Sequence, residues 1–271
     1  MNQQFALTGK SIVVTGGTGV LGDAFTKAIA AAGGTVGIVG RNEKVAGERA
    51  AAIVANGGKA IALIADVTSE SDLLNARDKM LAYAGKIDGL VNGAGGNMPG
   101  AVVQPGTDLF SIDMAALKQV VDLNLFGTVL PTQVFGEAIK QAGSGSIVNI
   151  SSMTAQLAVT RVLGYSMAKA SVDAYTRWFA VELANRFGDK IRMNAIAPGF
   201  FLTEQNRNLL TNPDGTYTTR GNAVIESTPY KRFGNANELT GVLLWLLSDA
   251  SSFVSGTVIP VDGGFSIFSG V

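Results

Sequence analysis

The stretch that decides the fold is SIVVTGGTGVLG, residues 11–22. Its first four residues, Ser11–Val14, are typical of a short buried strand, and a helix is predicted to follow from Asp23 to Ala32. The glycines between them let the backbone turn tightly, while free N–H groups and the helix dipole attract a phosphate. A turn that needs glycine only for its geometry is the simpler alternative, but the position between strand and helix favours a dinucleotide site. The candidate cofactor-binding residues here are Gly16, Thr18, Gly19, Val20 and Leu21.

The same alternation of short β-branched runs and Ala-rich amphipathic stretches continues along the chain. Further strands are predicted at Thr35–Val39, Ala60–Ala65, Ile87–Val91, Ser146–Ile150, Ile191–Ile196 and Thr257–Val261, and helices over Glu43–Ala55, Ser69–Ala84, Met114–Gln141, Tyr165–Phe187 and Asn237–Ser248. The pattern predicts an α/β fold over residues 1–271: a single-domain, Rossmann-type, doubly wound parallel sheet with helices on both faces. Phe200–Phe233 is rich in Pro, Gly, Asn and Thr, which predicts an irregular, mobile loop that covers the substrate.

Composition excludes several kinds of partner and chemistry. Lys and Arg together number 21, as do Asp and Glu, and no basic run occurs, so no nucleic-acid partner is expected. The chain has no Cys and no His, which excludes disulfides and thiol catalysis and removes the commonest metal ligands, so no metal is expected. Proton transfer must therefore use Tyr, Lys, Asp or Glu.

The longest apolar stretch, Val242–Leu247, is far shorter than the roughly 20 residues that cross a bilayer. Met1–Lys10 lacks a secretory pattern, so a cytoplasmic protein without a membrane partner is expected.

The end of the second predicted strand bears on the choice of cofactor. A site for NAD in such folds usually has Asp or Glu there, bonded to the ribose hydroxyls. Here the sequence is Val39-Gly40-Arg41-Asn42, with a cation and no carboxylate. Arg41 can pair with a 2′-phosphate through a planar, charge-assisted fork, although it can equally be a solvated loop residue. NADP(H) is therefore favoured, and NAD(H) stays possible.

Tyr165 and Lys169 are four positions apart on a predicted helix, so their side chains project from one face. A phenol titrates near 10 in water, and an adjacent ammonium or an oxidised nicotinamide lowers its pKa. Ser152 follows the fifth strand and can hold a substrate oxygen, while Asn124 can connect a water chain to Lys169. Each alone has a simpler explanation, as surface decoration, a strand-end cap or a helix cap. Together they predict proton transfer without His or metal.

These residues resemble the short-chain dehydrogenase/reductase family over essentially the whole chain. The motifs that carry the resemblance are the glycine-rich turn, Asp66-Val67, Asn92-Gly93-Ala94-Gly95, Asn124, Ser152, Tyr165-Ser166-Met167-Ala168-Lys169, Pro198-Gly199 with Thr203, and Asp262-Gly263-Gly264. The resemblance implies an NAD(P)-dependent oxidoreductase whose cofactor contacts Asp66, Val67, Asn92, Gly93, Ala94, Tyr165, Lys169, Pro198, Gly199 and Thr203. Two features depart from the family: the glycines at 16, 19 and 22 have the spacing of its longer members, and Gly93 replaces a usual second Asn.

Polar residues are predicted around the mouth of the substrate pocket: Asn97, Arg161, Glu204, Gln205, Asn206 and Arg207. Two of them, Arg161 and Arg207, are cations that can hold a carboxylate. Residues 95–97, 122–136, 198–207 and 262–271 resemble the D-mannonate oxidoreductases (fructuronate reductases) of the same family. That resemblance implies a keto sugar acid as substrate, with D-fructuronate reduced to D-mannonate. Asn97, Ser152, Arg161 and Arg207 are then the candidate substrate residues.

Three other functions stay open. A 3-oxoacyl-carrier-protein reductase shares the catalytic residues but needs a basic docking patch, and Arg177, Arg186, Lys231 and Arg232 offer a modest one. A gluconate 5-dehydrogenase differs in pocket detail. A cofactor-sensing regulator can keep the nucleotide site without chemistry, although the intact Ser, Tyr and Lys set argues against it. The family resemblance also implies pairing through the helices at 114–141 and 165–187, as a homodimer or homotetramer.

Overall fold

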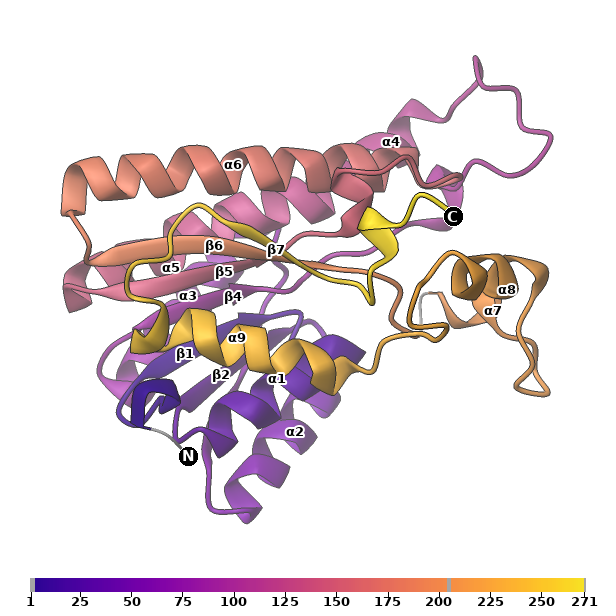
Figure 1. The fold of residues 1–271 in the computed structure, drawn as a ribbon. Helices are drawn as coiled ribbons and strands as arrows, with labels where there is room; N and C mark the ends of the chain where they lie inside the picture. The colour runs from indigo at the N-terminus through magenta and orange to yellow at the C-terminus, as the bar shows by residue number, and fades with distance from the viewer. Residues whose placement is uncertain (1–2, 204–205, 271) are drawn as a thin grey trace.

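A parallel sheet of seven strands forms the centre of the protein, in the order β3-β2-β1-β4-β5-β6-β7 (Figure 1). The computed structural model describes residues 3–203 and 206–270. Its strands are β1 (Ser11–Thr15), β2 (Thr35–Gly40), β3 (Lys59–Ile64), β4 (Gly89–Asn92), β5 (Gly145–Ile150), β6 (Ile191–Pro198) and β7 (Val258–Val261). The strand order reverses at β1, which pairs in parallel with both β2 and β4. This strand order confirms the predicted fold class. In doubly wound sheets, ligands bind where the strand order reverses.

Helices cover both faces of this sheet, as Figure 1 shows. The main helices are α1 (Val20–Ala31), α2 (Glu43–Ala55), α3 (Glu70–Ala84), α5 (Gly127–Ala142), α6 (Leu163–Phe187) and α9 (Thr240–Leu247). Strand side chains alternate between the faces, so Ile12 and Val14 join the core under α1, α2 and α9. Val13 joins the core under α3, α5 and α6. Within the described residues, none of these helices has the length and apolar character needed to cross a membrane.

The single long helix predicted at Met114–Gln141 is interrupted. The structure has α4 (Met114–Val121), a π turn (Asp122–Phe126) and then α5. Asn124 explains the interruption, because its side-chain amide donates to Val120 O at 2.8 Å and to Gly96 O at 2.7 Å. Its Oδ1 also accepts from Gly96 N at 2.9 Å. A side chain thus satisfies a helix carbonyl while tying the helix to the loop after β4, and π turns of this kind are frequent at functional sites.

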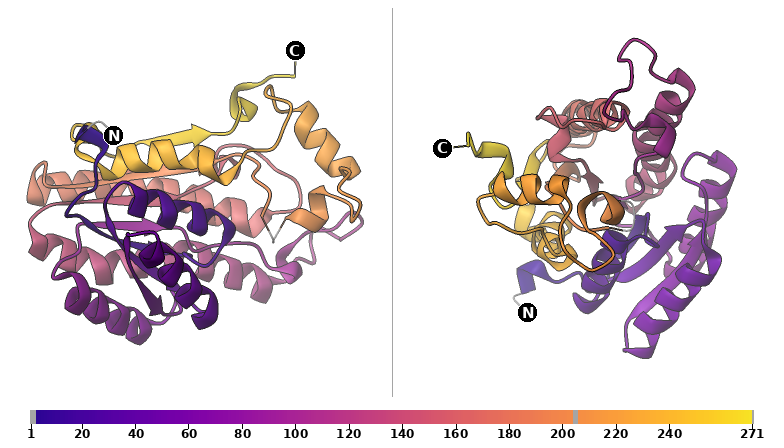
Figure 2. Two further views of the ribbon diagram at one scale, coloured as in Figure 1. Left: turned by 90° about the horizontal axis from the view of Figure 1, so that it is seen from below. Right: turned by 90° about the vertical axis from the view of Figure 1, so that its right-hand side faces the viewer.

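The segment predicted as irregular, Phe200–Phe233, is partly helical. It carries α7 (Arg207–Leu210) and α8 (Thr219–Glu226), and Thr218 caps α8 by accepting from Gly221 N at 3.0 Å. Leu210, Val224 and Phe233 form a small apolar cluster of their own, which orders a stretch whose composition suggested a loop. Figure 2 shows this orange segment in front of the sheet when viewed from the carboxyl ends of the strands.

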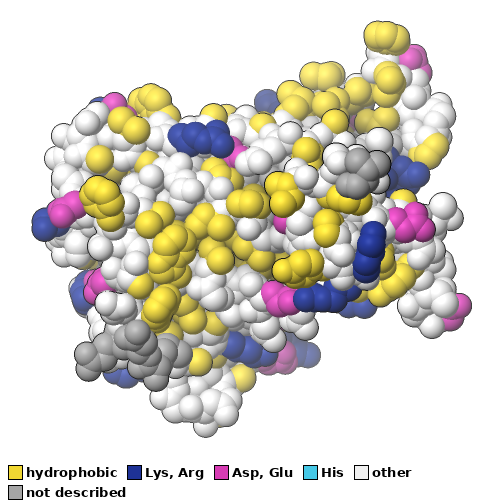
Figure 3. Space-filling model, viewed as in Figure 1, with side chains coloured by type: hydrophobic (Ala, Val, Ile, Leu, Met, Phe, Trp, Pro, Cys, Tyr) yellow, Lys and Arg dark blue, Asp and Glu magenta, His cyan; other side chains and the backbone are white. Residues whose placement is uncertain are grey.

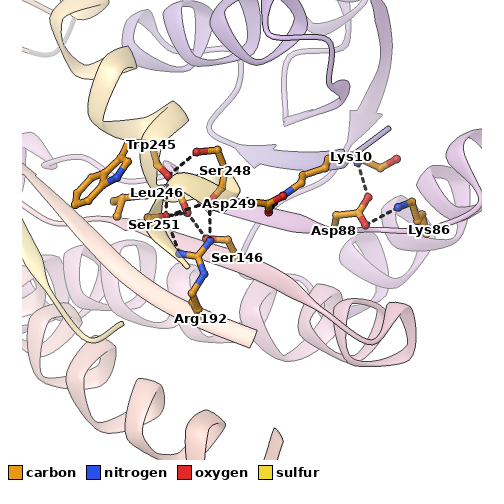
Figure 4. A network of polar contacts seen from close by, with 11 residues as sticks. Lys10, Lys86, Asp88, Ser146, Arg192, Trp245, Leu246, Ser248, Asp249 and Ser251 are labelled. Atoms are coloured by element: carbon orange, nitrogen blue, oxygen red, sulfur yellow. Dashed lines mark hydrogen bonds and ion pairs between the residues drawn. The ribbon is translucent and has the colours of Figure 1, made fainter. Parts of the chain in front are cut away.

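A buried polar network lies at the amino ends of the strands, opposite the glycine-rich turn (Figure 4). Arg192 on β6 is 8% exposed and donates to Ser251 Oγ at 2.9 Å and to Ser248 O at 3.1 Å. Ser146 on β5 donates to Leu246 O at 2.7 Å. These bonds join β5 and β6 to the end of α9, far from the carboxyl edge where ligands bind.

Replacing Arg192 with Met should destabilise the protein by about 1–3 kcal/mol, because Ser251 Oγ and Ser248 O each lose a hydrogen bond from the buried guanidinium. Urea unfolding followed by circular dichroism measures the change. Arg186→Met is the matched control, since Arg186 makes an exposed ion pair with Glu182 on α6 and should contribute less than about 1 kcal/mol. Equal unfolding midpoints for the two variants would contradict this role of the network.

Candidate active site

The glycine-rich turn after β1 forms a cradle that side chains would fill. Gly16 has φ +65°, and a Cβ there would lie 2.6 Å from Gly93 O. A Cβ on Gly22 would lie 2.2 Å from Gly16 O. Gly19 is the N-cap of α1 without a side-chain hydrogen bond, so no side chain caps the turn that begins with Val20. The turn therefore fits the pyrophosphate of a dinucleotide, as its sequence predicts.

Arg49 supports this turn from α2, a role that sequence reasoning missed. Its Nη1 donates to Gly17 O at 2.5 Å and to Gly19 O at 2.8 Å. Its Nε lies 3.3 Å from Asp23 Oδ1 on α1. Nothing in the local sequence indicates this, because only the tertiary fold brings the middle of α2 beside the turn.

The residues at the end of β2 and after β3 come together beside the turn. A Cβ on Gly40 would lie 2.6 Å from the Thr18 side chain, and Arg41 Nη1 is 3.7 Å from Asp66 Oδ2. Asp66 also accepts from Thr68 N at 2.9 Å and from Thr68 Oγ1 at 2.6 Å. Partial burial opposes the charge of Asp66, but the Thr68 bonds and Arg41 outweigh it, so the pKa of Asp66 is lowered. Next to Asp66, Val67 packs on α5, 2.9 Å from where a Cβ on Gly127 would lie.

Asn92, which the family resemblance places beside the cofactor, ends β4. It is fully buried, and its Nδ2 donates to Thr132 Oγ1 at 2.8 Å and to Asn149 Oδ1 at 2.9 Å. The side chain therefore joins β4 to α5 and β5, because a buried amide must find partners inside the fold. Gly93 and Ala94 do lie at the turn, where both backbone N–H groups donate to Thr15 Oγ1 at 3.1 and 3.2 Å.

The structure brings together Ser152, Tyr165 and Lys169 at the carboxyl end of β5. The phenol of Tyr165 is hydrogen-bonded to the Ser152 side chain, and Ser152 Oγ accepts from Thr154 N at 3.2 Å. Lys169 Nζ lies 5.5 Å from the centre of the Tyr165 ring and donates to Ile150 O at 2.7 Å. Lys169 is only 3% exposed, which is rare for a charged side chain.

Asn124 reaches this group across Gly95. A Cβ on Gly95 would lie 2.6 Å from Asn124 Oδ1 and 3.3 Å from Lys169 Nζ. Glycine is thus required where the loop after β4 passes between the π turn and α6. The four predicted catalytic residues therefore share one site, although they come from three separate parts of the chain: the π turn, the end of β5 and α6.

Burial changes the proton affinities in this site. It raises the pKa of the Tyr165 phenol, and the bond with Ser152 opposes that change. It lowers the pKa of Lys169 to about 8, while the charge of Asp173 opposes it. The ammonium of Lys169 is expected to lower the pKa of Tyr165, but in the protein without a bound cofactor burial has the larger effect. At neutral pH the phenol therefore keeps its proton, which suits a group that donates to a carbonyl oxygen.

The loop after β6 holds the remaining predicted cofactor residues. Pro198 ends β6, and a Cβ on Gly199 would lie 2.6 Å from Asp262 Cβ. Thr203 N donates to Asn206 Oδ1 at 2.8 Å, so Asn206 shapes the loop. Glu204 and Gln205 lie outside the described residues.

The predicted substrate residues differ in their surroundings. Asn97 Oδ1 accepts from Met98 N at 3.0 Å, and Arg207 is exposed at the start of α7. Arg161 has φ +76°, an uncommon conformation for a residue other than glycine, and its carbonyl accepts from Val103 N at 3.0 Å.

Arg220 on α8 is a second cation, near enough to Arg161 for its charge to affect Arg220, and sequence reasoning missed it. Its guanidinium donates to Thr160 Oγ1 and to Thr160 O, both at 3.1 Å. Burial, and then the charge of Arg161, lower the pKa of Arg220. No ion pair in the described part of the chain includes either arginine. The two lie in distant parts of the sequence, so no spacing rule could have joined them.

Comparisons with known proteins agree with this geometry. A family model described as enoyl-(acyl carrier protein) reductase matches residues 7–266. The uncharacterized oxidoreductase UxuB of Bacillus subtilis (strain 168) is 43% identical over 274 residues, which cover 98% of both chains. A solved structure of a candidate D-mannonate oxidoreductase from Haemophilus influenza, with bound NAD, has a TM-score of 0.90 and 38% identity, again over 98% of each chain.

A gluconate 5-dehydrogenase from Burkholderia cenocepacia J2315, solved with NADP and tartrate, has a TM-score of 0.85 and 30% identity over 97% of this chain and 98% of that one. These similarities span the glycine-rich turn, the site at the end of β5 and the segment after β6. The chain therefore belongs to the short-chain dehydrogenase/reductase family and is a nicotinamide-dependent oxidoreductase that acts on CH–OH groups.

Proposed function

We propose that the protein interconverts a keto sugar acid and its hydroxy acid, with D-fructuronate and D-mannonate as the pair. The observation that carries this proposal is the pair of cations Arg161 and Arg220, which have no acidic partner among the described residues. Arg161 is four positions before Tyr165 in the sequence, just before α6 begins at Leu163. Planar guanidinium groups bind carboxylates in a two-pronged geometry, so the pair suits an acidic substrate. The names of the two solved structures, which are sugar-acid enzymes, support the same class.

The proposed chemistry divides between cofactor and protein. The glycine-rich turn would hold the pyrophosphate of the cofactor and the loop after β6 would contact its nicotinamide, which would supply or accept the hydride. Ser152 Oγ donates a hydrogen bond to the substrate oxygen, and Tyr165 gives its phenol proton to that oxygen during reduction. The buried ammonium of Lys169 stabilises the resulting phenolate, and Asn124 holds the Gly96 loop that borders Lys169. In the oxidative direction the same phenolate takes the proton back.

NADP(H) is the proposed cofactor, with NAD(H) as the alternative. The side chain of Arg41 follows β2 and is 76% exposed, so it is free to bind a 2′-phosphate. Asp66 lies 3.7 Å from it and is the nearest described carboxylate to that guanidinium. Because the Arg41 side chain is exposed and its distance to Asp66 is long for an ion pair, a bound phosphate can compete with Asp66 for the guanidinium.

Self-association as a homodimer or homotetramer is also proposed. Trp178 and Val181 on α6 are 62% and 59% exposed, and Phe253 and Ile267, on either side of β7 in the sequence, are almost fully exposed. Figure 3 shows apolar side chains over the face that carries β7 and α9, with few charges among them. Such surfaces are typical of interfaces. A monomeric mass by light scattering would exclude this.

A turnover screen tests the proposed function. NADPH and NADH oxidation is followed with D-fructuronate, 5-keto-D-gluconate and an acetoacetyl thioester, and D-fructuronate should give the highest kcat/KM. A preference for the keto-gluconate would favour the gluconate dehydrogenase alternative, and a preference for the thioester would favour an acyl-carrier reductase. Cofactor binding without turnover on any of them would favour a regulator.

Tyr165→Phe should lower kcat by about 10²–10⁴-fold, because the phenol proton has no substitute in a protein without His. Cofactor affinity, measured by fluorescence titration, should change little. Tyr83→Phe on α3 is the control, since Tyr83 is 47% exposed and outside the site. A native rate for Tyr165→Phe would remove the central step of the proposed chemistry.

Arg41→Ala should raise the KM for NADPH by about tenfold or more, the effect of losing a charged hydrogen bond, and leave the KM for NADH nearly unchanged. Initial-rate kinetics with both cofactors give the ratio. Lys140→Ala, which removes an exposed cation paired with Glu137 on α5, should alter neither value. An unchanged ratio in Arg41→Ala would make Arg41 a solvated loop residue.

Arg161→Gln and Arg220→Gln should each raise the KM for D-fructuronate by about tenfold or more, with a smaller change in kcat. The less buried Arg207→Gln is tested beside them, and Lys190→Gln is the control because Lys190 is exposed and paired with Asp189. A slow neutral ketose, which has no carboxylate, should respond to none of these changes. Unaltered kinetics in both arginine variants would leave the proposed carboxylate site without support.

A further inference from the structure

We propose that Asp173 is a positioning residue of the active site: it fixes the end of β5 that carries Ser152 and keeps Lys169 charged. The inference rests on the proposed roles of Ser152, Tyr165 and Lys169, but not on which carbonyl compound is reduced. Asp173 itself does not reach the reacting atoms and acts through its neighbours.

The position of Asp173 on α6 places it behind the proton donor. It follows Lys169 by four residues and Tyr165 by eight, so all three share one face of the helix. Asp173 is 3% exposed, and its Oδ1 accepts a short hydrogen bond from Ser151 Oγ. Ser151 is 1% exposed and directly precedes Ser152. The carboxylate therefore holds the backbone from which the Ser152 hydroxyl projects.

A buried carboxylate needs compensation, and the groups around Asp173 supply part of it. Arg177 Nη2 lies 3.8 Å from Asp173 Oδ2, but its side chain is 57% exposed, so solvent screens this pair. Gln156, in the turn after β5, adds a side-chain hydrogen bond. Burial raises the pKa of Asp173, while Ser151, Arg177, Gln156 and Lys169 oppose that change. The charged groups that face Asp173 are thus Lys169 and Arg177, both on α6, and its partners from β5 and the following turn are neutral.

The same carboxylate acts on Lys169. The groups that face the ammonium are the ring of Tyr165 and Asp173 on α6, Ile150 O on β5, and Asn124 across Gly95. Asp173 is the anion among them. Since burial already lowers the pKa of Lys169 to about 8, removing this anion lets the ammonium lose its proton at still lower pH. Neutral lysine no longer stabilises a phenolate at Tyr165.

Two substitutions separate the two roles of Asp173. Asp173→Asn keeps the size and an oxygen that can accept from Ser151, but it removes the charge. The pH profile of kcat/KM for carbonyl reduction falls at high pH as Lys169 loses its proton, and this alkaline limb should then move to lower pH by roughly one unit. Ser151→Ala keeps the charge and removes the hydrogen bond, so it should lower kcat while leaving that limb in place. A merely structural residue would lower the rate by one factor at every pH.

Arg177→Gln extends the test if Asp173→Asn folds poorly, because Arg177 lies on the surface. It removes a cation that partly offsets the effect of the Asp173 charge on Lys169, so the pKa of Lys169 should rise. The alkaline limb should then move to higher pH, opposite to its shift in Asp173→Asn. Glu182→Gln is the control, since Glu182 is paired with Arg186 further along α6 and should leave the limb unchanged. An unchanged limb in both Asp173→Asn and Arg177→Gln would overturn the proposal.

The assays use whichever carbonyl substrate the wild-type protein reduces best. A failure of D-fructuronate as substrate therefore counts against the proposed function alone. An NMR titration of the lysine side-chain signals reads the Lys169 ammonium without turnover. It should show the same downward shift in Asp173→Asn, and its absence would contradict the proposal independently of the kinetics.

Discussion

The ammonium of Lys169 is almost completely removed from water, and much of the surrounding structure compensates for that burial. One carbonyl, Ile150 O, accepts its hydrogen bond at 2.7 Å, and the carboxylate of Asp173 opposes the effect of burial on its pKa. Without the charge of Asp173 the pKa of Lys169 would be lower still. A neutral amine would give Tyr165 no electrostatic help, so the proposed proton transfer depends on this compensation.

The π turn between α4 and α5 follows from the same requirement. Asn124 bonds to Val120 O, holds Gly96 through two bonds and lies across Gly95 from the ammonium, and all of these contacts occur within the π turn. The loop between them passes so closely that only glycine fits at residue 95. The irregular helix and the glycine are therefore two parts of one arrangement that seals Lys169 from solvent.

The sequence was sufficient where chemistry follows from local spacing. The glycine turn, the alternation of strands and helices, and the pair Tyr165 and Lys169 each carry a local signature, and the structure brings them together. The sequence was insufficient where a side chain acts on residues that only the tertiary fold brings near it. Asn92 is buried among polar partners from α5 and β5, and Arg49 braces a turn on another element. Asp173 is the intermediate case, because its spacing from Lys169 was visible but its burial was not.

The proposed cofactor end and the proposed substrate end of the site carry different charges, although the net charge of the chain is zero. Arg41 at the proposed cofactor end already has Asp66 at 3.7 Å. At the other end burial, and then the positive charge of Arg161, lower the pKa of Arg220. Like charges held together are destabilising unless a ligand relieves them, and the positive φ of Arg161 adds strain of its own. A carboxylate bound between the two guanidinium groups would gain attraction to both and remove their mutual repulsion. A neutral ketone would gain neither, so the same arrangement that costs stability in the free protein would select acids as substrates.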